Sequence, residues 1–190
     1  SSSDFEVPLQ APSAQAEMIG LDWGTSSIRA YLLSAAGGVL QQREGDEGTL
    51  KAAAIGFPAV FDRYVGDWRR QDPLAPVLMC GMIGSRQGWV EVPYLKCPAS
   101  LADLGASLCT VEPAPGVGLL RVVPGLCVDD GPGSAPDVMR GEETQLAGAF
   151  DMPAASGLCV LPGTHSKWAR LAHGRIERFA TYMTGELFAL

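Results

Sequence analysis

The sequence predicts an α/β fold in which two related strand–turn–strand units offer their turns to one cleft. An apolar run at residues 18–21 leads through a Gly-Thr turn into a second apolar run at residues 28–33. A fainter copy of this order occupies residues 158–171, and an amphipathic helical pattern lies between the copies at residues 50–68. Strand and helix patterns arranged in this way favour a mixed sheet with flanking helices.

The first turn reads Asp22-Trp23-Gly24-Thr25-Ser26-Ser27. Gly24 is expected to permit a tight reversal of the backbone. Hydroxyls from Thr25 and Ser26, together with backbone N–H groups, can bind phosphate oxygens. Asp22 at the start of the turn is a candidate ligand for Mg²⁺, which proteins usually hold with few carboxylates and with phosphate oxygens. An ordinary β-hairpin with a polar turn is the alternative.

The second copy is built around Gly163 and Thr164, which follow the apolar run at residues 158–161. No acid stands where Asp22 stands in the first copy. Superposing the two Gly-Thr pairs aligns three later positions as well: Ser27 with Ser166, Ala30 with Ala169 and Leu32 with Leu171. The repeat predicts two similar half-domains, each with a phosphate-binding turn.

The bulk properties exclude several classes of protein. The chain has 190 residues, is 47% hydrophobic and has a net charge of −7 without a basic run, so nucleic-acid binding is not expected. No stretch is long enough to cross a membrane, and residues 1–17 are predicted to be a flexible lead rather than a signal peptide. The five cysteines form no C-x-x-C motif, which predicts reduced thiols of a cytoplasmic protein and no zinc site.

The first predicted helix buries one apolar face. Thr49 is its expected N-cap, and Pro58 is expected to kink or divide it. Its apolar residues recur at steps of three and four and are predicted to belong to the core: Leu50, Ala54, Phe57, Phe61, Tyr64 and Trp68.

The next strand, at residues 77–80, runs into a glycine-rich loop at residues 81–89. Loops at the carboxyl ends of strands in α/β folds commonly bind ligands. The loop therefore predicts a sugar-acid pocket, in which Ser85 contributes a hydroxyl, Arg86 binds a carboxylate and Trp89 packs on a carbon face. A glycine-rich surface loop with a structural tryptophan is the alternative.

The middle of the chain is predicted to be irregular at residues 90–101, helical at 101–108 and a strand at 119–123. Residues 129–136 have the most loop-like composition and are the candidate boundary between the halves. The predicted organisation is a lead at 1–17, a first half-domain at 18–135 and the start of a second at 136–190.

A further helix is expected to begin near Gly141, with Glu142 and Glu143 in its first turn. Acids are favourable there because of the helix dipole, which is the plainer explanation. The functional interpretation is that one of the two carboxylates projects into the cleft as a general base.

These features together resemble sugar kinases of the actin-like ATPase superfamily, in which two such turns bind the phosphates of ATP. The resemblance implies a ribonuclease H-like fold. It also implies phosphate binding by Asp22, Gly24, Thr25, Ser26, Gly163 and Thr164, with Mg²⁺ at Asp22. In the superfamily a Gly-Asp pair usually supplies the base. Here Gly141 is followed by Glu142 and then Glu143, so the base is one of these two residues.

More specifically, the chain resembles 2-dehydro-3-deoxygalactonokinases from about Met18 to its end. The stretches that carry this resemblance include Gly81-Met82-Ile83-Gly84-Ser85, Met139-Arg140-Gly141-Glu142-Glu143 and Pro162-Gly163-Thr164-His165-Ser166. The resemblance implies ATP-dependent phosphorylation of 2-dehydro-3-deoxy-D-galactonate in galactonate catabolism. Members continue beyond the position of Leu190, so the second half-domain is predicted to be incomplete. The alternatives are a non-catalytic sugar-acid-binding or regulatory module, or an inactive fragment. The state of oligomerisation stays open.

Overall fold

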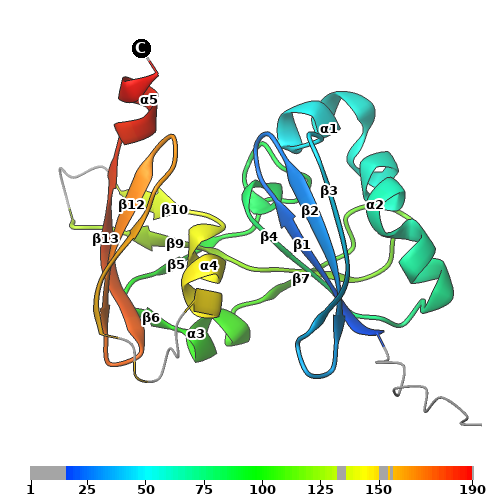
Figure 1. Cartoon of the computed structure of the whole chain (residues 1–190), viewed down its shortest axis with the longest axis horizontal. Helices are drawn as coiled ribbons and strands as arrows, with labels where there is room; N and C mark the ends of the chain where they lie inside the picture. Colours follow the sequence, from blue (N-terminus) through cyan, green and yellow to red (C-terminus); the bar gives the residue numbers. More distant parts are fainter. Residues whose placement is uncertain (1–15, 132–135, 150–153, 155, 190) are drawn as a thin grey trace, which may run out of the picture.

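The computed structural model describes residues 16–131, 136–149, 154 and 156–189 of the chain, arranged as two lobes (Figure 1). The expected lead at residues 1–17 lies almost entirely outside the described residues. The lobe on the right of Figure 1 holds the first sheet and the helices α1 and α2. The lobe on the left holds two smaller sheets with α3, α4 and α5.

The first lobe is built on a six-stranded mixed sheet. The strand β1 pairs antiparallel with β2 and parallel with β4, and β4 pairs parallel with β8. The parallel pairing places Asp22, near the end of β1, beside Cys80 at the end of β4. In spatial order the strands are β3 (Val39–Gly45), β2 (Ile28–Ser34), β1 (Ala16–Trp23), β4 (Val77–Cys80), β8 (Leu120–Val122) and β7 (Cys109–Val111).

The predicted long helix is divided, as expected. Helix α1 (Thr49–Ile55) ends at Gly56, whose φ of 106° few other residues adopt, and α2 (Phe57–Gln71) begins at once with Pro58 in its first turn. The apolar face of α2 packs on the sheet through Val60, Phe61, Val65 and Trp68. The prediction that Leu50 and Ala54 belong to the core was wrong, because both are exposed on α1. The N-cap prediction was wrong. Gly48 occupies that position, and Thr49 is the first helical residue, with its side chain buried.

The second lobe repeats the strand–turn–strand order of the first. Strands β11 (Gly157–Leu161), β12 (Ser166–Ala172) and β13 (Arg175–Tyr182) form an antiparallel meander, as β1, β2 and β3 do. Residues that the predicted alignment of the two copies pairs with each other are also buried to a similar extent. Ala30 and Ala169 are both fully buried, and Leu32 and Leu171 are 9% and 4% exposed.

Each lobe has its own hydrophobic core, but the chain does not divide between the cores at a single point. Segments before the predicted boundary pack in the second core through Ala99, Leu104 and Leu126. Part of that boundary, residues 132–135, lies outside the described residues. The elements that complete the second lobe are β5 (Tyr94–Lys96), β6 (Ala99–Ser100), α3 (Leu101–Ala106), β9 (Gly125–Val128), β10 (Asp137–Met139), α4 (Glu142–Ala149) and α5 (Thr184–Phe188).

The prediction that residues 90–101 are irregular was therefore wrong in part. Strand β5 pairs with β9, and β6 pairs with β13, whose Ile176 lies opposite Ala99. Both strands are only two or three residues long. Their partners come from distant parts of the chain, so no local pattern reveals them.

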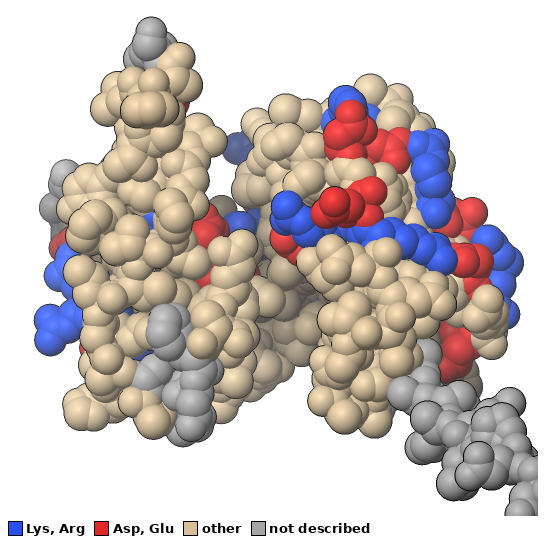
Figure 2. All heavy atoms as spheres, viewed as in Figure 1, with Lys and Arg blue, Asp and Glu red and all other residues tan. Residues whose placement is uncertain are grey.

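Charged residues gather on the first lobe, where blue and red side chains alternate in Figure 2. The best-defined pair joins Arg43 and Asp67 through two contacts of 2.6 and 2.7 Å. All five cysteines are free. Among the helices of the described residues, none has the length and apolarity needed to cross a membrane.

Candidate active site

The first Gly-Thr turn closes the end of β1 and is held from behind by the start of α1. The Gly24 amide donates to the carbonyl of Ser27 at 2.9 Å, which forms the turn. The carbonyls of Gly24 and Thr25 in turn accept from the amides of Thr49 and Leu50, at 2.9 and 3.2 Å. The backbone of the turn is therefore fixed before any ligand arrives.

The structure gives the glycines near the first turn a different role from the tight backbone reversal that was predicted at Gly24. A side chain at position 24 would find only ordinary contact, with its nearest neighbour, the Ser27 carbonyl oxygen, at 3.6 Å. The tight position is Gly48, where a Cβ atom would lie 2.3 Å from the carbonyl oxygen of Thr25. Gly48 lets α1 begin directly against the turn, and Gly24 lines the cleft.

Two further glycines bring the ends of β1, β4 and α4 together. Gly81 follows β4 with a φ of 90°, and a Cβ there would lie 2.8 Å from the carbonyl oxygen of Trp23. Gly141 precedes α4 with a φ of 110°, and its Cβ would lie 3.3 Å from the Cα of Gly81. The acidic first turn of α4 is thereby placed close to Asp22, whose Oδ1 is itself near Gly81.

Glu142 and Glu143 have different environments, although they are neighbours in the chain. Glu142 lines the cleft, and its Oε2 accepts from the Arg140 amide at 3.0 Å. Glu143 is fully buried and accepts from the Gly141 amide at 2.7 Å and from the Thr144 hydroxyl at 3.1 Å. Burial, the largest cause, raises the pKa of the Glu143 carboxyl to about 7.

The second Gly-Thr turn joins β11 to β12 and is backed by α5. The Glu186 amide donates to the Thr164 carbonyl at 3.0 Å, and the Glu186 carboxylate lies 2.6 Å from Nε2 of His165. A Cβ atom at Gly185 would lie 2.4 Å from the carbonyl oxygen of Gly163, so α5 touches the turn directly. Helix α5 therefore supports the second turn from behind, as α1 supports the first.

Both turns line one cleft of about 530 Å³, which opens between the two lobes in Figure 2. The predicted residues that line it are Asp22, Gly24, Thr25, Glu142, Gly163 and Thr164. The cleft therefore combines two polar turns from different lobes with two carboxylates. A set of this kind can bind an anionic group between the turns and accept a proton beside it.

Other predicted site residues do not line this cleft. Ser26 is exposed and borders a separate shallow pocket with Arg29 and Glu44. Glu143 stays buried behind Glu142 because it bonds to the Gly141 amide.

The predicted ligand loop also lies elsewhere. Ser85 is buried and Arg86 is exposed, and neither lines the cleft. The Trp89 ring stacks on Phe57 at 6.1 Å between centroids and also packs on Phe61 at 5.5 Å, so its apolar surface belongs to the first core. These contacts agree with the alternative interpretation, in which Trp89 is a structural residue of the loop and does not bind a ligand.

The cleft also has residues that the sequence reasoning did not select, chiefly Tyr94, Arg140, His165 and Lys167. Lys167 is 8% exposed, and its Nζ donates to the Val138 carbonyl and the Thr181 hydroxyl, both at 2.6 Å. Arg140 and Lys167 lie next to motifs that were recognised, Gly141-Glu142 and Gly163-Thr164. Their closeness to these motifs in the sequence is the feature that could have identified them as site residues.

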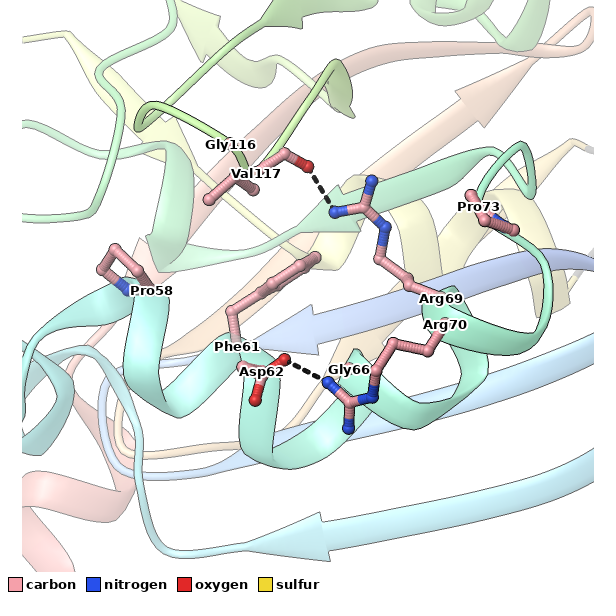
Figure 3. Close-up of a pocket in the computed structure, with 9 residues that line it drawn as sticks. All are labelled: Pro58, Phe61, Asp62, Gly66, Arg69, Arg70, Pro73, Gly116 and Val117. Carbon is pink, nitrogen blue, oxygen red and sulfur yellow. Dashed lines mark hydrogen bonds and ion pairs between the residues drawn. The ribbon is translucent and has the colours of Figure 1, made fainter.

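A second hollow, of about 460 Å³, lies between α2 and the loop that holds Gly116 and Val117 (Figure 3). Each of its three charged side chains has at least one partner, although Nε of Arg69 has none among the described residues. Arg70 pairs with Asp62 at 2.8 Å, and Nη1 of Arg69 donates to the Val117 carbonyl. None of the predicted site residues lines it. The cleft between the lobes is therefore the candidate active site.

No group of three or more metal-binding side chains occurs among the residues that the structure describes. Mg²⁺ needs fewer protein ligands than that, because phosphate oxygens and water usually complete its coordination. The Asp22 carboxylate at the cleft fits such a site.

Comparisons with known proteins identify the family of the chain. A family model described as 2-keto-3-deoxy-galactonokinase matches residues 22–190. A protein of Rhizobium meliloti (strain 1021), named as a 2-dehydro-3-deoxygalactonokinase, is 45% identical over 170 residues, which is 88% of this chain and 54% of that protein. The 2-dehydro-3-deoxygalactonokinase of Escherichia coli (strain K12) is 40% identical over 177 residues, which is 92% of this chain and 56% of that protein.

A solved structure shows the same relationship. The crystal structure of a protein from Sinorhizobium meliloti, described as a 2-dehydro-3-deoxygalactonokinase, superposes with a TM-score of 0.78 at 43% identity. The match covers 90% of this chain and 56% of that one. The chain thus spans about half the length of the relatives that it matches. On the family model and these identities, the chain belongs to the 2-keto-3-deoxy-galactonokinase family.

Proposed function

We propose that this chain forms the phosphate-binding and proton-accepting part of an ATP-dependent kinase that phosphorylates 2-dehydro-3-deoxy-D-galactonate. The observation that carries the proposal is that two Gly-Thr turns from different lobes line one cleft with Glu142. The names of the relatives support the choice of acceptor. The paired three-strand meanders support a ribonuclease H-like fold of the actin-like ATPase type.

In this proposal the two turns hold the triphosphate from opposite sides. Amides and hydroxyls of Gly24 and Thr25 bind from the first lobe, and those of Gly163 and Thr164 bind from the second. Phosphoryl transfer depends mainly on positioning and on neutralising charge, which a fixed backbone provides without reorganisation. Bound Mg²⁺, held by Asp22, would supply further positive charge to the phosphate oxygens.

Glu142 is the proposed base because it reaches the cleft, whereas Glu143 does not. An acceptor hydroxyl attacks the γ-phosphorus while the bond from that phosphorus to the bridging oxygen breaks, and ADP leaves. The hydroxyl proton passes to the Glu142 carboxylate. Glu143 is the proposed positioning residue, since its bond to the Gly141 amide fixes the turn from which Glu142 projects.

A coupled assay of ADP release on a small panel of 2-keto-3-deoxy sugar acids tests the proposal. The expected result is ADP release that depends on 2-dehydro-3-deoxy-D-galactonate and on Mg²⁺. Calorimetry with ATP–Mg²⁺ and with the sugar acid, each alone, completes the test. Sugar-acid binding without nucleotide binding would contradict the proposal and would favour a non-catalytic binding module.

A further inference from the structure

Arg140 is a buried cation without a counter-ion among the described residues. The residue is only 8% exposed. Nη2 donates to the Val92 carbonyl at 2.8 Å, while Nε and Nη1 are buried and have no hydrogen-bond partner within the described part of the chain. Burying charged donors without acceptors is costly, so such a group calls for an explanation.

The contrast with Lys167 shows that the cleft is able to satisfy a buried cation. Lys167 is equally buried, but two oxygen acceptors bind its Nζ, and the Asp137 carboxylate lies 3.9 Å away. The Glu142 carboxylate, which is close to Arg140 in the chain, binds the Arg140 amide and leaves the guanidinium unpaired. Among the described residues, no carboxylate therefore pairs with the Arg140 guanidinium.

The surroundings place the guanidinium at the Tyr94 side of the cleft. Its Cζ lies 4.2 Å from the centre of the Tyr94 ring, and both residues line the cleft. Gly84 makes room for it, since a Cβ there would lie 2.8 Å from Nη1. Tyr94 and Gly84 belong to the segment after β4, whereas the two Gly-Thr turns belong to the β1–β2 and β11–β12 connections.

We propose that Arg140 binds the carboxylate of the acceptor and so selects a sugar acid over a neutral sugar. This inference rests on the proposed kinase function. A carboxylate supplies both the negative charge and the acceptor oxygens that the guanidinium lacks. Since Nε and Nη1 are shielded from solvent, the guanidinium must turn towards the ligand, and its one hydrogen bond, to Val92, is the bond that it gives up.

Isothermal calorimetry on this chain tests the inference with two ligands, 2-dehydro-3-deoxy-D-galactonate and its uncharged C1 amide. The wild-type chain is expected to bind the acid roughly 10- to 100-fold more tightly than the amide, as for one hydrogen bond to a charged group. Arg140→Met should remove this preference and leave affinity for the amide and for ATP–Mg²⁺ unchanged. Arg86→Met, at the exposed arginine, is the matched control and should keep the preference.

Thermal unfolding separates ligand binding from a structural role. Methionine keeps the length of the side chain and removes an unpaired buried charge, so the Tm of Arg140→Met should equal or exceed that of the wild type. A large fall in Tm with equal losses for acid, amide and ATP–Mg²⁺ would overturn the inference. If the variant does not fold, the wild-type comparison decides, because equal affinity for acid and amide also overturns it.

The outcomes distinguish this inference from the proposed function. A wild-type chain that binds the acid, with an acid preference that survives Arg140→Met, removes only the role of Arg140. A wild-type chain that binds neither the acid nor the amide removes the proposed acceptor, and the inference falls with it.

Discussion

At the scale of single residues, Glu142 and Glu143 occupy the two sides of one turn, and their roles follow from that difference. Replacing Glu142 by glutamine keeps the shape of the side chain and removes the proton acceptor. Turnover of the proposed reaction should fall by about 10²- to 10⁴-fold, the usual contribution of a general base. A coupled assay measures this fall, and the affinity for ATP–Mg²⁺, measured by calorimetry, should stay near that of the wild type.

Glu112→Gln is a suitable control, because Glu112 is exposed and does not line the cleft. Its turnover should match that of the wild type. Unchanged turnover in Glu142→Gln would remove Glu142 from the role of base, and a loss in Glu143→Gln alone would assign that role to its neighbour.

Glu143 should make stability depend on pH. Burial raises the pKa of its carboxyl from 4.5 to about 7 in the folded chain. Between these pH values the folded state binds more protons than the unfolded state, so stability falls as pH rises from about 4.5 to about 7. A shift of this size corresponds to at most about 3 kcal/mol.

Glu143→Gln should remove this contribution, because the amide is neutral at every pH and its oxygen still accepts from Gly141. Urea unfolding at pH 5 and at pH 8 measures the change. The stability of the variant relative to the wild type should be greater at pH 8 than at pH 5. The same relative stability at both pH values would show that the carboxyl does not titrate in this window.

Replacing Trp89 distinguishes a role in the hydrophobic core from a role in ligand binding. Its ring packs on Phe57 and Phe61 in the first core, so Trp89→Ala should lower the free energy of unfolding by roughly 3 kcal/mol. The KM for the sugar acid should stay unchanged in the folded fraction. A raised KM without a loss of stability would restore the sequence-based expectation that this ring contacts the ligand.

Sequence reasoning at this scale found both Gly-Thr turns and the acidic pair, because short motifs carry those features. It proposed Arg86 as the carboxylate-binding arginine and did not select Arg140. Which arginine is buried at the cleft depends on how the segments after β4 and before α4 meet, through Gly81 and Gly141. Local residue types do not contain that information.

At the scale of elements, each Gly-Thr turn is held from behind by the start of a helix. Gly185 in α5 shows the dependence most clearly, since a Cβ there would lie 2.4 Å from the Gly163 carbonyl oxygen. Gly185→Ala should displace the second turn and weaken ATP–Mg²⁺ binding by about tenfold, which is the effect of losing about 1.4 kcal/mol.

Gly148→Ala in α4 is the matched control, because a Cβ at that position has no heavy atom within 4 Å. Alanine there should leave binding unchanged and stabilise the helix by roughly 0.5–1 kcal/mol. Calorimetry with ATP–Mg²⁺ compares the two variants. Equal affinity in both would mean that contact with α5 does not set the geometry of the second turn.

Elements with a strong periodic pattern were predictable. The division of α1 and α2 followed from Pro58, and the core positions Phe61 and Trp68 of α2 followed from their repeat, whereas Leu50 and Ala54 of α1 are exposed. The two meanders followed from their apolar runs and glycine-containing turns. The short strands β5 and β6 were not predictable, because each exists only through pairing with a strand far away in sequence. The N-cap of α1 was misplaced by one residue, since close approach to Thr25, rather than side-chain capping, selects Gly48.

At the scale of the whole molecule, one glycine contact joins the lobes at the cleft, between Gly141 and Gly81, and two others fix the segments on either side of it. Gly81 lies against Trp23, Gly141 against Gly81, and Gly185 against Gly163. The internal repeat in the sequence predicted two related units with similar turns. It did not predict that Ala99, Leu104 and Leu126 pack in the second core, because the packing of non-consecutive segments leaves no periodic signal.

The central claim is that the two Gly-Thr turns hold one triphosphate between the lobes. A crystal structure of this chain with Mg²⁺ and a non-hydrolysable ATP analogue tests it most directly. The account predicts phosphate oxygens within hydrogen-bond distance of both Thr25 and Thr164, with the metal ion beside Asp22. A bound nucleotide whose phosphates contact only one of the turns, or lie outside the cleft, would contradict it.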